Sequence, residues 1–195
     1  MAIVGPSGSG KTTLLKIMAG LVESKGEIKV AGVMLNHLLP PALRQFRLMR
    51  LGQVFQDFEL LDYLTVEENI LLPARLHPVD ESRESIEERV RSLAVSAGLE
   101  KCLSRTPETL SRGEQQRAAI CRALLLSPKI ILADEPTASL DPASKEGVMD
   151  LLLECCRKEN TTVVTVTHDM EVAHHHDKVI DVSEYGHPIP RKEDQ

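Results

Sequence analysis

The sequence predicts an α/β protein built around a mostly parallel β-sheet. Three runs rich in apolar and β-branched residues, at residues 129–134, 161–169 and 178–182, are typical of strands covered on both faces. Stretches with helical periodicity separate these runs, and strands that alternate with helices indicate a parallel sheet. A glycine-rich segment that begins at Gly5 directly follows a short apolar run at residues 2–4. With 195 residues, 42% of them hydrophobic, the chain is long enough for one domain with a sizeable core.

The first third of the chain is expected to alternate between short strands and helices. Residues 2–4 form the apolar run before the glycine-rich segment. Three apolar residues on one face predict a helix over residues 11–19, which Gly20 ends. These residues are Leu14, Leu15 and Met18. The pattern then predicts a strand with a turn, a short helix with proline in its first turn, and a further strand. They lie at residues 26–33, 40–47 and 51–56.

The segment from residue 57 to residue 108 is predicted to be helical. Its first helix begins at a capping box, in which Thr65 caps the helix and Glu68 reaches back to it. A second helix is predicted over residues 80–97, where apolar residues recur at helical spacing among many charges. Gly98 ends this helix.

Two later helices also carry cap signals. Ser111 and Glu114 have the spacing of a second capping box, at the start of a helix that precedes the strand at residues 129–134. Asp141 is the predicted cap of the next helix, with Pro142 at the first helical position.

Composition and charge exclude several classes of protein. The formal net charge of −6 argues against a protein that binds nucleic acid through its overall field. The four cysteines show no metal-like spacing and are interpreted as reduced residues of a cytosolic protein. The histidine run at residues 174–176 is expected to face solvent, because three consecutive residues cannot all face one metal. The apolar runs are short, so we expect a soluble chain without a transmembrane span or signal peptide.

The glycine-rich segment matches the pattern of a phosphate-binding loop at every fixed position. Glycines let backbone N–H groups turn toward phosphate oxygens, and the following helix adds its positive N-terminus. In this pattern Lys11 reaches the β- and γ-phosphates, Thr12 binds Mg²⁺ and Thr13 supports the α-phosphate. A Gly/Ser linker is the alternative, which the ordered strand, loop, lysine and helix disfavour. The predicted nucleotide-binding residues are Gly5, Pro6, Ser7, Gly8, Ser9, Gly10, Lys11, Thr12 and Thr13.

An apolar strand that ends in two adjacent acids supplies a second part of such a site. Asp134 would hold the metal and Glu135 would act on the attacking water, which are separate tasks in phosphoryl transfer. Alone, two acids at the end of a strand could equally be structural. Together with the phosphate-binding loop, they indicate a nucleoside triphosphate site.

With these residues the chain resembles the ATP-binding subunits of ABC transporters. The stretch LSRGEQQR, residues 110–117, is similar to the signature sequence of that family and lies just upstream of LADEP. Gln56 matches the Q-loop glutamine, and His168 matches the switch histidine. The D-loop is matched by Ser139, Leu140 and Asp141. Within the family, the chain looks most like the small subunits of lipoprotein-release, macrolide-export and cell-division complexes.

The resemblance implies a P-loop NTPase core of the RecA-like type, with a mostly parallel sheet and an inserted α-helical subdomain. Residues 1–56 and 116–195 would form the core, and residues 57–115 the helical subdomain with the signature. Members of the family begin with antiparallel strands that carry an aromatic residue stacked on adenine. Because four residues precede Gly5, we expect these strands to be largely missing, and no residue is nominated to hold the adenine.

The resemblance also implies a dimer that encloses two ATP molecules with Mg²⁺. The expected catalytic residues are Glu135, His168, Gln56 and Lys11. The expected ligands of Mg²⁺ are Thr12, Gln56 and Asp134. The signature of the partner domain would contribute Ser111, Arg112, Gly113 and Glu114. Arg112 stands where the family usually has glycine, and it could crowd the partner's nucleotide or add a favourable charge.

An integral membrane permease is the second implied partner. It would contact the segment Asp57–Val66, where we expect exposed apolar side chains, although these could instead pack inside the helical subdomain. The side chains concerned are Phe58, Leu60, Leu61 and Tyr63. The chain would then be cytoplasmic and peripheral on the inner face of the cell membrane, with no nucleic-acid partner.

Three alternatives fit part of the pattern. A soluble ABC ATPase of DNA repair would need a long coiled-coil insertion, and one of translation would need two such domains. A truncated ATP-binding module with little or no turnover is a further alternative, because few residues precede Gly5. The intact motif residues argue against it. A P-loop kinase is disfavoured, since it needs neither a signature helix nor a switch histidine.

Overall fold

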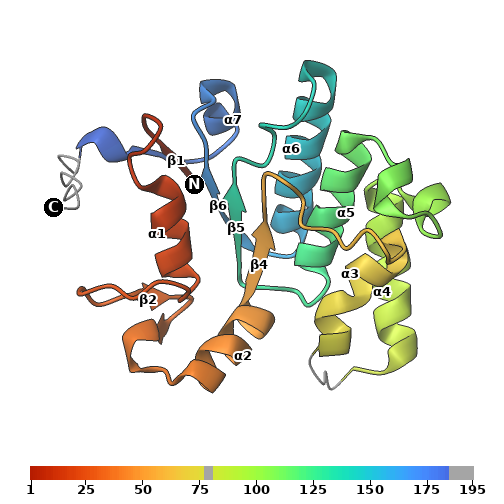
Figure 1. Ribbon diagram of the computed structural model, residues 1–195, viewed down its shortest axis with the longest axis horizontal. Coiled ribbons are helices and arrows are strands. Elements are labelled where there is room, and N and C mark those ends of the chain that lie inside the picture. Colours follow the sequence, from red (N-terminus) through yellow and green to blue (C-terminus); the bar gives the residue numbers. More distant parts are fainter. Residues whose placement is uncertain (77–80, 185–195) are drawn as a thin grey trace, which may run out of the picture.

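The computed structural model describes residues 1–76 and 81–184, and a five-stranded parallel sheet runs through its centre (Figure 1). The strand order is β4-β5-β6-β1-β7, and each pairing in this sheet is parallel, which confirms the predicted α/β class. In that order, the strands span Leu51–Val54, Ile130–Asp134, Thr162–Val166, Ala2–Val4 and Val179–Asp181. A separate antiparallel hairpin consists of β2, Lys29–Val30, and β3, Val33–Met34.

The helices follow the predicted order with small differences at their ends. They are α1 Lys11–Met18, α2 Pro40–Arg50, α3 Val66–Leu76, α4 Arg83–Ser96, α5 Arg112–Leu124, α6 Pro142–Lys158 and α7 Met170–His174. Single 3₁₀ turns span Leu35–His37, Glu100–Cys102, Pro107–Thr109 and Val182–Glu184. Within residues 1–76 and 81–184, no helix combines the length and the hydrophobicity needed to cross a membrane.

The predicted helix caps are present. Glu68 N–H donates to Thr65 Oγ1 at 3.2 Å, while the Glu68 carboxylate accepts from Thr65 N–H at 3.0 Å. Ser111 and Glu114 form the same reciprocal pair at the start of α5. Asp141 accepts from the N–H group of Ser144 and caps α6. Each cap satisfies backbone donors that the first turn of a helix leaves without partners.

Residues 57–65 were predicted to be helical, and this prediction is wrong: they form an irregular loop. The buried side chain of Asn69 provides the hydrogen bonds that a helix would otherwise make. Its Oδ1 accepts from Leu61 N–H at 2.7 Å, and its Nδ2 lies within 3.2 Å of three loop carbonyls. One amide on α3 therefore fixes the loop, which periodicity along the loop itself cannot indicate.

Two buried clusters cover the two faces of the sheet. Alternate residues of β5 point to opposite sides, so that Ile131 belongs to one cluster and Leu132 to the other. The first cluster joins the sheet to α3, α4, α5 and α6. The second joins it to α1, α2 and the β2–β3 hairpin. The result is a three-layer arrangement with the sheet in the middle (Figure 1).

One histidine of the predicted solvent-facing run is buried. His174 and His175 are exposed, as expected, but His176 is only 9% exposed and lies between α7 and β6. Its Nδ1 donates to the carbonyl of Val172 at 3.1 Å, which leaves Nε2 to accept from the Thr165 hydroxyl at 2.9 Å. α7 ends at His174, and the turn that follows directs His176 back toward the sheet. Burial lowers the pKa of His176.

Helix α5 and strand β4 make an unusually close contact at Gly52. A Cβ atom at this position would lie 2.5 Å from the carbonyl oxygen of Ala123 and 2.2 Å from Cδ1 of Ile131. Backbone cannot yield as a flexible side chain can, so any larger residue would push α5 away from β4. This contact sets the distance between α5 and the strand that leads to Gln56.

We predict that Gly52→Ala lowers the free energy of unfolding by about 1–3 kcal/mol, because it overpacks the contact between α5 and β4. Gly147→Ala is the matched control: this glycine lies within α6, and a Cβ there meets no atom within 4 Å. The control should be neutral or stabilising by up to about 1 kcal/mol. Denaturant unfolding monitored by circular dichroism compares the two. Equal stability of both variants would contradict the prediction.

We also predict that the stability of the fold decreases as the pH falls below the ordinary histidine pKa of 6.5, in part through His176. The unfolded chain binds a proton there more readily than the folded chain, so protonation favours unfolding by up to about 1 kcal/mol per pH unit. The charged groups that act on it are the Met1 amine, His175 and Asp177.

His176→Gln should therefore show a smaller difference in unfolding free energy between pH 7.5 and pH 5.5 than the natural chain. His174→Gln, at an exposed position of the same run, should keep the natural difference. An unchanged difference in the His176 variant would show that another group causes the pH dependence.

Candidate functional site

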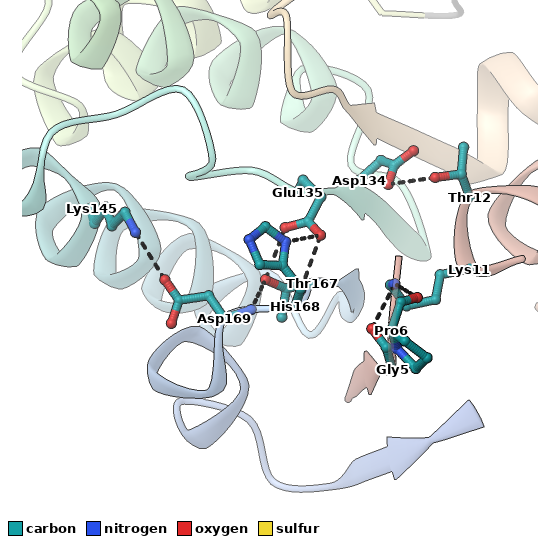
Figure 2. Close-up of polar contacts among 10 residues, drawn as sticks. All are labelled: Gly5, Pro6, Lys11, Thr12, Asp134, Glu135, Lys145, Thr167, His168 and Asp169. Atoms are coloured by element: carbon teal, nitrogen blue, oxygen red, sulfur yellow. Dashed lines mark hydrogen bonds and ion pairs between the residues drawn. The ribbon is translucent and has the colours of Figure 1, made fainter. Parts of the chain in front are cut away.

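The glycine-rich segment forms the loop between β1 and α1. Gly8 and Gly10 have φ angles of 80° and 90°, a region that other L-residues rarely adopt. Lys11 folds back over the loop, and its amine donates to the carbonyls of Gly5 and Pro6 at 2.9 Å each (Figure 2). The Ser9 hydroxyl is buried and has no partner within the described residues. The loop therefore places the Lys11 cation at the start of α1, where it lines a cavity, while the Ser9 hydroxyl stays buried.

Asp134 lies at the carboxyl end of β5, opposite the start of α1. Its Oδ1 accepts from the Thr12 hydroxyl at 3.1 Å. Burial raises the pKa of Asp134, the nearby Glu135 charge adds to this, and the hydrogen bond from Thr12 opposes it. A hydroxyl and a half-buried carboxylate side by side are oxygen ligands of the kind that Mg²⁺ prefers.

Glu135 follows directly and has both carboxylate oxygens engaged. Oε1 accepts from His168 N–H at 3.0 Å and lies 2.7 Å from the Nδ1 of the same residue. Oε2 accepts from the Thr167 hydroxyl at 3.0 Å. The Glu135 side chain is 16% exposed and that of His168 69% exposed. The carboxylate thus lies at the boundary between the protein interior and an open cavity.

Six of the nine predicted residues of the phosphate-binding loop line one cavity of about 510 Å³ together with the two acids and the histidine, whereas Gly5, Pro6 and Ser9 do not. Gln56, from the loop after β4, lines it too. The lining residues of the cavity are Ser7, Gly8, Gly10, Lys11, Thr12, Thr13, Gln56, Asp134, Glu135, Ala138, Val166 and His168. Segments more than 100 residues apart in the sequence therefore meet at the carboxyl edge of the sheet.

The signature residues do not line this cavity. Ser111 caps α5, with its hydroxyl 2.7 Å from Glu114 Oε2, and Gly113 is buried so close to the start of α6 that a Cβ would lie 3.2 Å from Ser144 Oγ. Of the predicted D-loop residues, Leu140 is buried and Asp141 is the α6 cap. The structure thus separates the signature from the cavity of its own chain.

The expected apolar exposure of the Asp57–Val66 segment is wrong for one residue. Phe58 is only 7% exposed, and the guanidinium of Arg112 lies over its ring at 5.9 Å from the centroid. Leu60 and Leu61 are half-buried, and Tyr63 is 79% exposed as expected. Phe58 packs inward because its backbone has φ 61°, a conformation that the sequence does not indicate.

A groove of about 580 Å³ lies beside this segment, between α2, β4, α3 and α5. Its walls are apolar at Leu21, Phe55 and Leu76, and they also carry three arginines, Arg44, Arg47 and Arg122. Arg122 donates to the carbonyls of Phe58, at 2.7 Å, and Glu59. Arg122 therefore holds one wall of the groove.

Two features of the site were missed in the sequence. Gln116 of α5 is fully buried, and its Nε2 donates to the Pro136 carbonyl at 2.6 Å and approaches that of Phe55 at 3.5 Å. Thr167 is 1% exposed and contacts Glu135. A polar residue among the buried positions of α5 was the available signal for Gln116. No comparable signal marks Thr167, since threonine is common in strands.

Curated proteins are similar in sequence to this chain over most of its length. The lipoprotein-releasing system ATP-binding protein LolD of Rickettsia bellii is 45% identical over 92% of this chain and 78% of its own length. The macrolide export ATP-binding/permease protein MacB of Rhodopirellula baltica is 40% identical over 92% of this chain and 26% of its own length. The ABC transporter ATP-binding protein YxdL of Bacillus subtilis is 43% identical over 86% of this chain and 65% of its own length. The chain therefore spans only part of these two latter relatives.

A solved structure shares the fold. It is a dimeric post-hydrolysis state of the ATP-binding cassette MJ0796 bound to ADP and Pi, with a TM-score of 0.82 and 39% sequence identity. The match covers 92% of this chain and 79% of that one, which confirms the predicted fold. A family model described as ABC transporter matches residues 1–138. The resemblance found in the sequence is thereby confirmed: the chain belongs to the ABC transporter family.

Proposed function

We propose that this chain binds and hydrolyses ATP with Mg²⁺, as the ATP-binding subunit of an ABC transporter. The observation that carries the proposal is the single cavity in which Lys11, Thr12, Asp134, Glu135 and His168 come together. Family membership and relatives such as LolD, an ATP-binding protein of a lipoprotein-releasing system, support it.

The groups in the cavity fit a nucleotide with its metal. The amine of Lys11 suits phosphate oxygens, and Thr12 and Asp134 suit Mg²⁺ together with Gln56. Bound Mg²⁺ would neutralise charge that develops on the phosphate oxygens. The half-buried carboxylate of Asp134 would be better satisfied beside a cation than by the Thr12 hydroxyl alone.

Glu135 is the proposed general base. Its carboxylate borders the cavity and would accept a proton from the attacking water. His168, 2.7 Å from Glu135 Oε1 and largely exposed, would orient that carboxylate and stabilise charge on the phosphate. Gln56 would position the water and contact the metal from the loop after β4.

A second copy or a homologous domain would complete the site. The signature residues lie outside the cavity of their own chain, at the N-terminus of α5, where Ser111 and the N–H group of Gly113 could contact an anion. In a head-to-tail pair they would contact the partner's nucleotide. The dimeric MJ0796 structure, which is 39% identical to this chain, supports this arrangement.

The proposed membrane partner is a permease that docks at the groove beside Asp57–Val66. Exposed Tyr63 and Leu76 and the apolar groove walls offer a surface for a partner element. The chain would then work on the cytoplasmic face of the cell membrane. The name of the MacB relative, an ATP-binding/permease protein, supports a partner of this type.

We predict that Glu135→Gln lowers kcat for ATP hydrolysis by about 10²–10⁴-fold, because the amide cannot accept the proton. Unhydrolysed ATP should then hold two chains together, so that light scattering shows a dimer with MgATP and a monomer without it. Phosphate release measures kcat.

Two controls accompany this experiment. Glu154→Gln changes an exposed acid of α6 and should keep natural turnover. Adding Lys11→Ala to the Glu135 variant should abolish the dimer. A folded monomer in saturating MgATP, together with a natural chain that releases no phosphate, would instead indicate a binding module without turnover.

A further inference from the structure

We propose that Thr167 is a positioning residue that holds the Glu135 carboxylate toward the attacking water. This inference rests on the proposed function, in which Glu135 is the general base. Within residues 1–76 and 81–184, the Thr167 hydroxyl forms hydrogen bonds with Glu135 and Asp169 and none with the phosphate-binding loop, so it would act through Glu135.

The hydrogen bonds of Thr167 fix the direction of its hydroxyl proton. The oxygen accepts from Asp169 N–H at 3.0 Å, so the hydroxyl proton is directed to Glu135 Oε2, also at 3.0 Å. The Thr167 backbone N–H donates to the Ile3 carbonyl at 3.1 Å. The hydroxyl is therefore held between Asp169 N–H and Glu135 Oε2. The backbone of Thr167 is bonded to β1, the strand that leads into the phosphate-binding loop.

A second layer of contacts holds the turn after Thr167. Asp169 Oδ2 lies 2.9 Å from the amine of Lys145, on α6, and Asp169 Oδ1 accepts from Glu171 N–H at 3.0 Å. Figure 2 shows the resulting chain of contacts from Lys145 through Asp169 and Thr167 to Glu135. α6 begins at the D-loop, so this chain of contacts also connects Glu135 to that loop.

The two carboxylate oxygens of Glu135 differ in how firmly they are held. Oε2 is bound by a hydroxyl that is 1% exposed, where water does not compete. Oε1 is bound by the N–H group of His168 and by a ring that is 69% exposed. When that ring moves, the Thr167 hydroxyl still holds Oε2, and the His168 N–H group holds Oε1. Glu135 has φ 47°, so its side chain depends on such contacts for its direction.

The test compares Thr167→Val, which keeps the shape but removes the hydroxyl, with Thr167→Ser, which keeps the hydroxyl. The valine variant should lose about tenfold or more in kcat, the size of a lost hydrogen bond to a charged group. Its KM for ATP should equal that of the natural chain. The serine variant should recover most of kcat. Thr161→Val is the control, because that buried hydroxyl donates only to the Pro128 carbonyl, remote from the cavity.

A double-variant cycle separates positioning from a purely structural role. In a Glu135→Ala background, Thr167→Val should cause no further loss in single-turnover hydrolysis, because no carboxylate remains to be positioned. An equal fold-loss in both backgrounds would overturn the proposal, as would natural kcat in Thr167→Val when Glu135→Gln is inactive. Natural turnover in Glu135→Gln would refute the assignment of Glu135 itself, and this inference with it.

Discussion

The register of three parallel strands sets the distances on which the candidate site depends. β5 and β6 pair Asp134 with Val166, and β6 and β1 pair Val166 with Ile3. The residues that follow these three positions therefore emerge at one level of the sheet: Glu135, the Thr167–His168 pair, and the loop that begins at Gly5. A shift of one residue in either pairing would turn each of these side chains to the opposite face. The geometry of the site thus follows from the pairing of the strands at the edge where it lies.

Helix α5 connects this edge of the sheet to the helical segment. Its backbone lies against Gly52 of β4, its Gln116 bonds the carbonyl after Glu135, and its Arg122 holds the loop after Gln56. At its C-terminal end, Arg89 of α4 donates to the carbonyls of Leu124 and Leu125 and pairs with Glu159 at 2.7 Å. α5 therefore contacts both the groove and the carboxyl edge of the sheet.

Local patterns in the sequence were sufficient where the structure is decided locally. The caps at Thr65, Ser111 and Asp141 and the phosphate-binding loop depend on residues within a few positions of each other, and the structure has these caps. The loop at residues 57–65, the burial of His176 and the contact of Thr167 with Glu135 depend on partners that are distant in the sequence or on a strained backbone. No periodicity encodes such contacts, so the sequence predicted residues that line the cavity but not the contacts that hold Glu135.

Arg112 shows how the fold accommodates a departure from the family pattern. A side chain in place of glycine needs space at the N-terminus of α5, and the guanidinium lies over the Phe58 ring, a contact worth about 0.5–1 kcal/mol at an exposed site. The Phe58 ring is buried, and its carbonyl accepts a hydrogen bond from Arg122 at 2.7 Å. The same contact attaches the signature to the loop that carries Gln56. Arg112 therefore adds a direct contact between the start of α5 and the loop that follows Gln56.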